Sequence, residues 1–292
     1  MNAATKRSVK DPMTIDARAR RSTVPWKSVS WRGCSVPLQI HILTTRALRA
    51  LWMDPKLVLV SVASPLVMLL VLSQVFTSIS ETRSFPGGVD YIQFLLPAIM
   101  IMGVLQSGLG SGAALCQEIK NGFVHRMRTL PVWPGSVLLG RSASDLLRSL
   151  IQLSALSTAA HLFFSFHAPG GAVGMAVAML IALMTGNCLG WVFIAMACWF
   201  RNAEVMQTFS GLAMFALMFG TNAFVPLDGL PDWLRSLSHV NPMTYAITAA
   251  RGWILGDPDM SATLYAVIGS AVIALPCALL AVKGFARPLG TN

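Results

Sequence analysis

Residues 149–200 read SLIQLSALSTAAHLFFSFHAPGGAVGMAVAMLIALMTGNCLGWVFIAMACWF, a run of 52 residues that contains no Asp, Glu, Lys or Arg. A helix needs about 20 apolar residues to cross the ~30 Å hydrocarbon core of a bilayer. The run is too long for one such helix, and the His-Ala-Pro-Gly-Gly sequence at 167–171 is a typical turn signal. It therefore predicts two transmembrane helices, at 149–166 and 172–200.

The rest of the chain contains four more apolar stretches of spanning length, at 57–80, 91–117, 205–225 and 261–282. The composition also indicates a membrane protein, since 54% of the residues are hydrophobic and only 12% are charged. Soluble domains carry about 25% charged residues. The predicted fold class is an all-α polytopic membrane protein with six transmembrane helices.

The distribution of the 22 Lys and Arg residues predicts the orientation of these helices. Nineteen lie before the first span, in the 118–148 loop, or beside span ends on the same side of the membrane. The opposite side has only Arg83, Arg235 and Arg251, together with six acidic residues. Because Lys and Arg accumulate in cytoplasmic loops, both termini are predicted to be cytoplasmic. Positive charge spread around a membrane collar in this way argues against binding to nucleic acid.

The two ends of the chain are not expected to span the membrane. Residues 1–36 form a polar, basic cytoplasmic tail that is expected to be disordered, and residues 288–292 form a second short tail. Residues 37–53 have the pattern of an amphipathic helix that lies at the cytoplasmic interface. The alternative is an extension of the first transmembrane helix, against which Pro55 argues. The transmembrane domain is therefore expected at 37–287.

The outer segment at 226–259 is too long and too apolar for a simple tether. Asp232 and Asn241-Pro242 are typical helix starts. We therefore expect two short re-entrant helices that dip into the outer leaflet, with Trp233 and Trp253 in the aromatic belt of the membrane.

Sequence motifs for catalysis are absent from the chain. No Gly is followed by Lys, so the phosphate-binding GxxxxGK[ST] loop is missing, and neither HExxH nor GxSxG occurs. The five cysteines are scattered without a CxxC pair, so no metal site is predicted. These observations argue against an enzyme.

Neutral polar residues within the predicted spans are candidates for a transport pathway. They include Gln106, Asn187 and Asn222, and no ionisable residue is expected in the middle of a span. Ion-coupled transporters place ionisable groups there, so the pattern instead suits a large amphiphilic cargo. Interhelical packing is the alternative role for each of these residues. The pairs Gly108-xxx-Gly112 and Gly186-xxx-Gly190 predict close helix contacts within or between subunits.

The central segment at 118–131 reads EIKNGFVHRMRTLP and lies in the predicted cytoplasmic loop. Its apolar residues alternate with His125, Arg126 and Arg128 at a spacing that is consistent with a short amphipathic helix ended by Pro131. Such a helix would suit docking into a groove on a soluble protein. The alternative is a solvated basic loop that serves only the topology.

Two sets of motifs in this chain resemble a known family. The first comprises Glu118 and Gly122, Leu130-Pro131-Val132, and Leu138 with Gly140-Arg141. The second comprises Phe224-Val225-Pro226, Leu230-Pro231 with Trp233-Leu234, Asn241-Pro242-Met243-Thr244-Tyr245, and Arg251-Gly252. Over residues 37–287 the chain resembles membrane subunits of ABC-2-type exporters, and within that family the daunorubicin/doxorubicin-resistance permeases.

The resemblance implies a permease subunit in the bacterial plasma membrane. It would pair with a second copy or a sister permease and with two separate ATPase subunits. ATP and Mg would bind those partners, and no cofactor would bind this chain. The resemblance also assigns roles to two sets of residues. The ATPase-coupling set is Glu118, Gly122, His125, Arg126, Arg128, Leu130 and Pro131. The re-entrant outer-helix set is Pro231, Trp233, Asn241, Pro242, Tyr245 and Arg251.

The function implied is ATP-driven export of an amphiphilic drug, polyketide or lipid. One alternative is a polysaccharide or glycolipid exporter of the same family, although spans richer in Met and Phe than in Tyr or Trp favour a lipophilic cargo. Another is a membrane scaffold that binds an ATPase without transporting anything.

The coupling role predicts the behaviour of the double variant Arg126→Glu/Arg128→Glu. Reversing both charges should leave membrane insertion intact and abolish stimulated ATPase activity and export, because the docking contact is lost. Both activities are measured on the purified complex. Full activity in a correctly inserted double variant would contradict the assignment.

Overall fold

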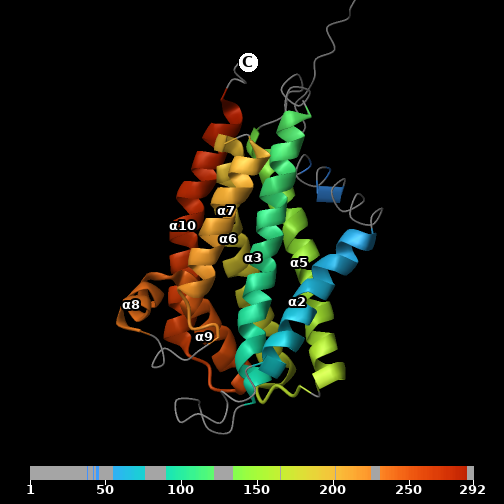
Figure 1. Ribbon diagram of the computed structural model, residues 1–292, viewed down its shortest axis with the longest axis vertical. Coiled ribbons are helices and arrows are strands. Elements are labelled where there is room, and N and C mark those ends of the chain that lie inside the picture. The colour runs from blue at the N-terminus through green and yellow to red at the C-terminus, as the bar shows by residue number, and fades with distance from the viewer. Residues whose placement is uncertain are drawn as a thin grey trace, which may run out of the picture. The chain divides into compact units, whose positions relative to one another are not determined.

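A computed structural model describes residues 38, 42, 44–45, 55–75, 90–121, 134–164, 166–200, 202–224 and 231–287. All of them belong to one compact unit at 34–292, and within these ranges the chain forms helices and no strand. The helices are α2 (Pro55–Val75), α3 (Tyr91–Lys120), α5 (Pro134–Phe164), α6 (Gly171–Phe200), α7 (Ala203–Phe219), α8 (Asp232–Val240), α9 (Pro242–Leu255) and α10 (Met260–Ala286). The predicted all-α class is confirmed for the described residues (Figure 1).

Three of the six predicted spans are helices that are long and apolar enough to cross a membrane, namely α3, α6 and α10. The chain is therefore a membrane protein. The apolar part of α2 and the whole of α7 are shorter. The count of six crossings and the cytoplasmic placement of both termini stay predictions.

Helix α5 differs from the expected third span. The span was expected to begin at Ser149, whereas the helix begins at Pro134 and continues to Phe164. The helix is longer than the expected span because charged residues, which were taken to end the span, do not end the helix, and the bounds of the span itself stay a prediction. Within the folded chain these residues find polar partners on α3 and extend the helix.

Helices α3 and α6 pack in close contact, and glycines make this contact possible. A Cβ atom on Gly108 would lie 2.9 Å from the Cα atom of Gly190, and one on Gly186 would lie 2.6 Å from the Cβ atom of Val104. A Cβ atom on Gly112 would lie 2.8 Å from the carbonyl oxygen of Phe193. The two predicted glycine pairs therefore pack against each other within one chain.

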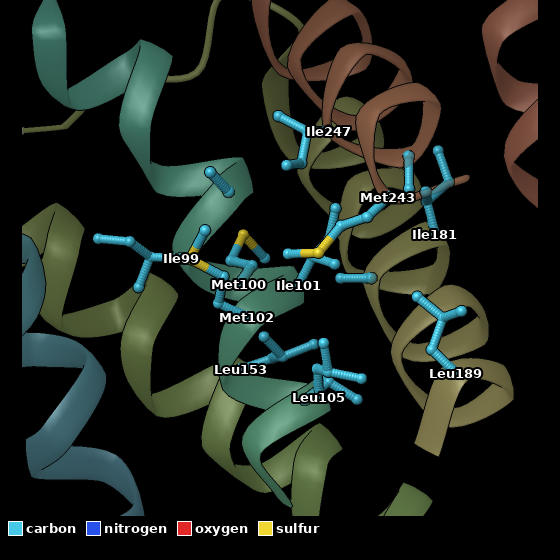
Figure 2. Packing of buried hydrophobic residues seen from close by; sticks show 14 of the residues in the cluster. Ile99, Met100, Ile101, Met102, Leu105, Leu153, Ile181, Leu189, Met243 and Ile247 are labelled. Atoms are coloured by element: carbon cyan, nitrogen blue, oxygen red, sulfur yellow. The ribbon is translucent and has the colours of Figure 1, made fainter. Parts of the chain in front are cut away.

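The apolar core is centred on α3. Its residues from Phe94 to Leu105 are buried on all sides, as expected for a helix that is surrounded by other helices. Figure 2 shows α3 meeting α5, α6 and α9 in this core. The labelled side chains are Ile99, Met100, Ile101, Met102, Leu105, Leu153, Ile181, Leu189, Met243 and Ile247.

The predicted turn at 167–171 is confirmed, because α5 ends at Phe164 and α6 begins at Gly171. Gly171 has a φ of 66°, which favours glycine. The turn also packs against the end of α9. The backbone N–H of Gly170 donates to the carbonyl of Ile254 at 2.9 Å, and a Cβ atom on Gly174 would lie 2.2 Å from the Trp253 carbonyl oxygen.

Helix α10 begins with a side-chain cap from Asp259. Its carboxylate accepts hydrogen bonds from the Ser261 hydroxyl and from the backbone N–H groups of Ser261 and Ala262. These hydrogen bonds stabilise the ionised form and hold the pKa of Asp259 below its usual value.

The predictions for the chain ends fall largely outside the described residues. This holds for the disordered tail at 1–36, the tail at 288–292 and most of the interfacial helix at 37–53. The four described residues of that helix are helical. One of them, Thr44, donates from its hydroxyl to the carbonyl of Gly140 on α5 at 3.3 Å.

The glycine contact predicts different changes in the free energy of unfolding for the same substitution at two neighbouring positions of α3. Gly108→Ala should destabilise the protein by about 1–3 kcal/mol, because the new methyl group meets backbone that cannot move aside. Gly110→Ala is the matched control, since a Cβ atom there meets nothing within 4 Å. Chemical unfolding in detergent measures both, and equal effects would contradict the glycine contact.

Candidate functional site

The structure describes one of the seven predicted ATPase-coupling residues. Glu118 lies in the last turn of α3, so it belongs to that helix and not to a separate loop helix. The other six lie outside the described residues, namely Gly122, His125, Arg126, Arg128, Leu130 and Pro131. The structure therefore describes residues 118–121, which we call the base of the central segment.

The two helices on either side of that segment are joined by an ion pair. The guanidinium of Arg141 on α5 pairs with the carboxylate of Glu118 on α3. Arg141 also donates from Nη1 to the carbonyl of Ser111 at 3.1 Å. The sequence prediction included Arg141 in the family motif but not among the site residues. A signal for its role was present, because Glu118 and Arg141 are opposite charges at the two ends of one loop.

A second polar contact joins α5 to the middle of α3. Arg148 donates from Nε to the hydroxyl of Ser107 at 3.0 Å and from Nη2 to the Ser107 carbonyl at 2.9 Å. The carboxylate of Asp145 lies 3.7 Å from Arg148. Ser107 lies near the midpoint of α3 and precedes Gly108 of the glycine contact. An ionisable side chain from outside the predicted span at 149–166 therefore reaches the middle of α3, which the sequence did not indicate.

A small cavity lies between α3, α5 and α6 at this level. Its lining residues are Val104, Gly108, Asp145, Ser149, Asn187, Gly190 and Ile194. Asn187 accepts a hydrogen bond at its Oδ1 atom from the hydroxyl of Ser142 on α5 at 3.1 Å. The polar side of the cavity is therefore contributed mainly by α5.

The structure does not bring the three predicted pathway residues together. Gln106 is exposed on α3, and Asn187 lies at the cavity between helices. Asn222 is buried beyond the end of α7 and donates to the hydroxyl of Thr248 on α9 at 2.9 Å. The contacts of Asn187 and Asn222 fit the interhelical packing alternative, and a pathway role for all three stays a prediction.

The two short helices predicted at 226–259 are present, and their predicted starts are confirmed, whereas their re-entrant position in the outer leaflet stays a prediction. Helix α8 begins at Asp232 after Pro231, and α9 begins at Pro242 after Asn241. Asn241 is buried and makes three contacts. Its Oδ1 atom accepts from the backbone N–H of Met243 at 3.0 Å, and its Nδ2 atom donates to the carbonyls of Leu217 at 2.9 Å and Gly220 at 3.0 Å. Asn241 therefore caps α9 and holds it against the end of α7.

Arg251 on α9 makes the second connection at this end of the bundle. Its guanidinium donates to the carbonyls of Phe94 and Asn222, both at 3.2 Å, and lies 3.5 Å from the centroid of the Phe94 ring. Tyr91 donates from its hydroxyl to the carbonyl of Phe224 at 3.4 Å. These contacts connect α3, α9 and the segment after α7.

The remaining outer-helix residues lie in different surroundings. Pro242 is buried, and Tyr245 donates from its hydroxyl to the carbonyl of His239 at 2.9 Å. Trp233 is 71% exposed on α8, and Leu237 and Val240 are exposed on the same face. Figure 1 shows α8 beside the lower part of the bundle. An exposed apolar face on a short helix suits the membrane interface.

The chain is similar to proteins of one family. Residues 38–255 match the family described as ABC-2 type transporter. The chain is 30% identical over 206 residues to the daunorubicin resistance ABC transporter permease of Streptomyces coeruleorubidus, covering 70% of this chain and 71% of that protein. It is 25% identical over 251 residues to the "probable doxorubicin resistance ABC transporter permease" of Mycobacterium tuberculosis, covering 86% and 87%. It is 25% identical over 174 residues to an inner membrane transport permease of Escherichia coli, covering 59% and 66%.

Comparison of two asparagine caps, Asn202 and Asn241, predicts how much Asn241 contributes to stability beyond capping its own helix. Asn202 caps α7 in the same way, accepting from the backbone N–H of Glu204 at 3.0 Å, but it is exposed. Asn202→Ala should destabilise the protein by about 1 kcal/mol, the usual value of a cap. Asn241→Ala should cost about 1–3 kcal/mol more, because the carbonyls of Leu217 and Gly220 each lose the hydrogen bond from Asn241 inside the bundle. Thermal unfolding in detergent measures the difference, and equal losses would contradict the proposed connection to α7.

Proposed function

The chain belongs to the ABC-2 type transporter family, and on that premise we propose that it is the membrane-spanning permease subunit of an ATP-binding cassette exporter. The observation that carries the proposal is the extent of the family match. It includes the base of the central segment and both outer helices. Two of its relatives are named as drug-resistance permeases. The cargo proposed is an amphiphilic drug, a polyketide or a lipid.

The energy source proposed is ATP hydrolysed by separate subunits. The sequence has no phosphate-binding loop, so this chain needs a partner to use ATP. The partner would dock on the central segment at 118–131. The ion pair between Glu118 and Arg141 supports this proposal, because it joins α3 and α5, the two long helices between which the segment lies. A force applied there would reach α3 and α5 together.

A second permease copy or a sister permease is the other partner proposed. Helix α7 supports this idea, since it exposes large apolar side chains along its length, including Phe209, Leu212, Phe215 and Phe219. Some of this surface would face lipid, and some would face the second subunit. The cargo would pass between the two subunits, where the exposed amide of Gln106 could offer it a hydrogen bond. The complex would lie in the bacterial plasma membrane.

The proposal is tested by transport in vesicles. The chain is co-purified with an ABC ATPase subunit that assembles with it and is reconstituted into liposomes, with daunorubicin and a fluorescent phospholipid as probes. ATP-dependent movement of at least one probe is expected. It should be lost when the ATPase subunit carries a substitution that prevents hydrolysis.

The other outcomes separate the alternative functions. A complex that binds and hydrolyses ATP but moves no probe would support the scaffold. Movement of a lipid-linked oligosaccharide, but of neither probe, would support the polysaccharide or glycolipid exporter.

A further inference from the structure

Helix α5 has a polar face that is turned into the bundle. We call it the α5 polar face, and its members are Arg141, Ser142, Asp145, Arg148, Ser149 and Gln152. Their spacing of three, four and seven residues places them along one side of a helix. All of them are buried or half-buried, whereas Leu139, Leu147, Leu150 and Ile151 are exposed on the rest of the helix.

In a soluble protein the apolar face of a helix is buried and the polar face is exposed, whereas in α5 the polar face is buried and apolar side chains are exposed. Ionisable residues are costly inside a membrane protein, and where they occur they usually face the bundle interior and serve a function. Packing of α5 against α3 and α6 would be possible with apolar side chains alone. The polar face therefore calls for an explanation beyond stability.

The polar face contacts α3 at two levels. Arg141 binds Glu118 and the Ser111 carbonyl near the end of α3, and Arg148 binds Ser107 near its middle. Glu118 and Ser107 are separated by about 16 Å along the helix axis at 1.5 Å per residue. Two charge-assisted contacts this far apart oppose tilting or sliding of α5 relative to α3.

The contact between Arg148 and Ser107, near the middle of α3, lies beside the glycine contact of α3 and α6. Ser107 precedes Gly108, whose backbone touches Gly190, and the cavity beside them is lined by Asp145. Ser142 binds Asn187 on α6. Where two helix backbones are in direct contact, no flexible side chain lies between them. A small displacement of one helix therefore displaces the other. A shift of α5 would therefore be felt at the α3–α6 contact.

We propose that Arg148 is a positioning residue that transmits a displacement of α5 to the α3–α6 glycine contact, with the Glu118–Arg141 ion pair as the point where the movement enters α5. The inference rests on the proposed function, since the movement is supplied by the ATPase. It assigns a role to Arg148 and Arg141, which lie neither in the docking segment nor among the predicted pathway residues.

The first test removes the polar contact while keeping the fold. Replacing both members of a buried ion pair by neutral residues of similar size is often tolerated, whereas removing one partner leaves an unpaired buried charge. The variant is therefore Asp145→Asn/Arg148→Met. Arg235→Met is the matched control, because Arg235 lies on α8, away from the α5 polar face. Both are purified with the ATPase subunit and checked for assembly by gel filtration.

The readout is chosen to be independent of the cargo. Hydrogen–deuterium exchange of residues 103–112 on α3 is compared between nucleotide-free and vanadate-trapped complexes. The wild type and Arg235→Met should show a nucleotide-dependent change in this stretch. In Asp145→Asn/Arg148→Met the change should fall about fivefold or more, a typical size for a lost coupling between sites. ATP hydrolysis should continue, since the docking segment is untouched.

A second variant keeps the test decisive if the first does not assemble. Arg148→Lys keeps the positive charge beside Asp145, but an ammonium lacks the planar fork that binds both oxygens of Ser107. It should assemble and show a reduced exchange response. A wild-type response in either assembled variant would overturn the proposal, as would a wild type that transports a probe without any change in 103–112. Absence of ATP-driven transport of daunorubicin, phospholipid and oligosaccharide in the wild type would instead refute the proposed function.

Discussion

The backbone contact between Gly108 and Gly190 determines how the other helices are arranged. Lipid tails are as apolar as the helices, so helices in a membrane associate mainly through close packing and interhelical hydrogen bonds. The glycines allow α3 and α6 to approach to contact distance. Helix α3 is then buried along its first half, with α5 and α9 packed against it (Figure 2). A larger side chain at the contact would separate the two helices around which the bundle is built.

The two ends of the bundle are stabilised by different interactions. At the end predicted to face outward, Asn241 and Arg251 bind backbone carbonyls, and Gly174 packs against the backbone of Trp253. Contacts of this kind leave little freedom. At the other end, Arg141 pairs with the carboxylate of Glu118 and also binds the carbonyl of Ser111.

The features that the sequence predicted well depend on local signals. The starts of α8 and α9 follow from Asp232 and Asn241-Pro242, and the turn before Gly171 follows from its Pro-Gly-Gly sequence. The start of α5 was not predictable in this way. A rule that ends spans at charged residues cannot know that Arg148 finds Ser107 41 residues away along the chain. The surroundings of Gln106, Asn187 and Asn222 were also not predictable, because helices that are apolar on all sides have no period from which to read a buried face.

The order of α3 and α5 along the chain has a consequence for how the protein enters the membrane. Helix α3 is synthesised first, so Glu118 and Ser107 are already in place when the ribosome delivers Arg141 and Arg148. A helix with two arginines and one aspartate is a poor substrate for insertion by itself. Beside a partner that offers a carboxylate and backbone carbonyls, it can enter with its charges already bound. We therefore expect insertion of α5 to depend on α3, so that the two helices enter the bilayer as a pair.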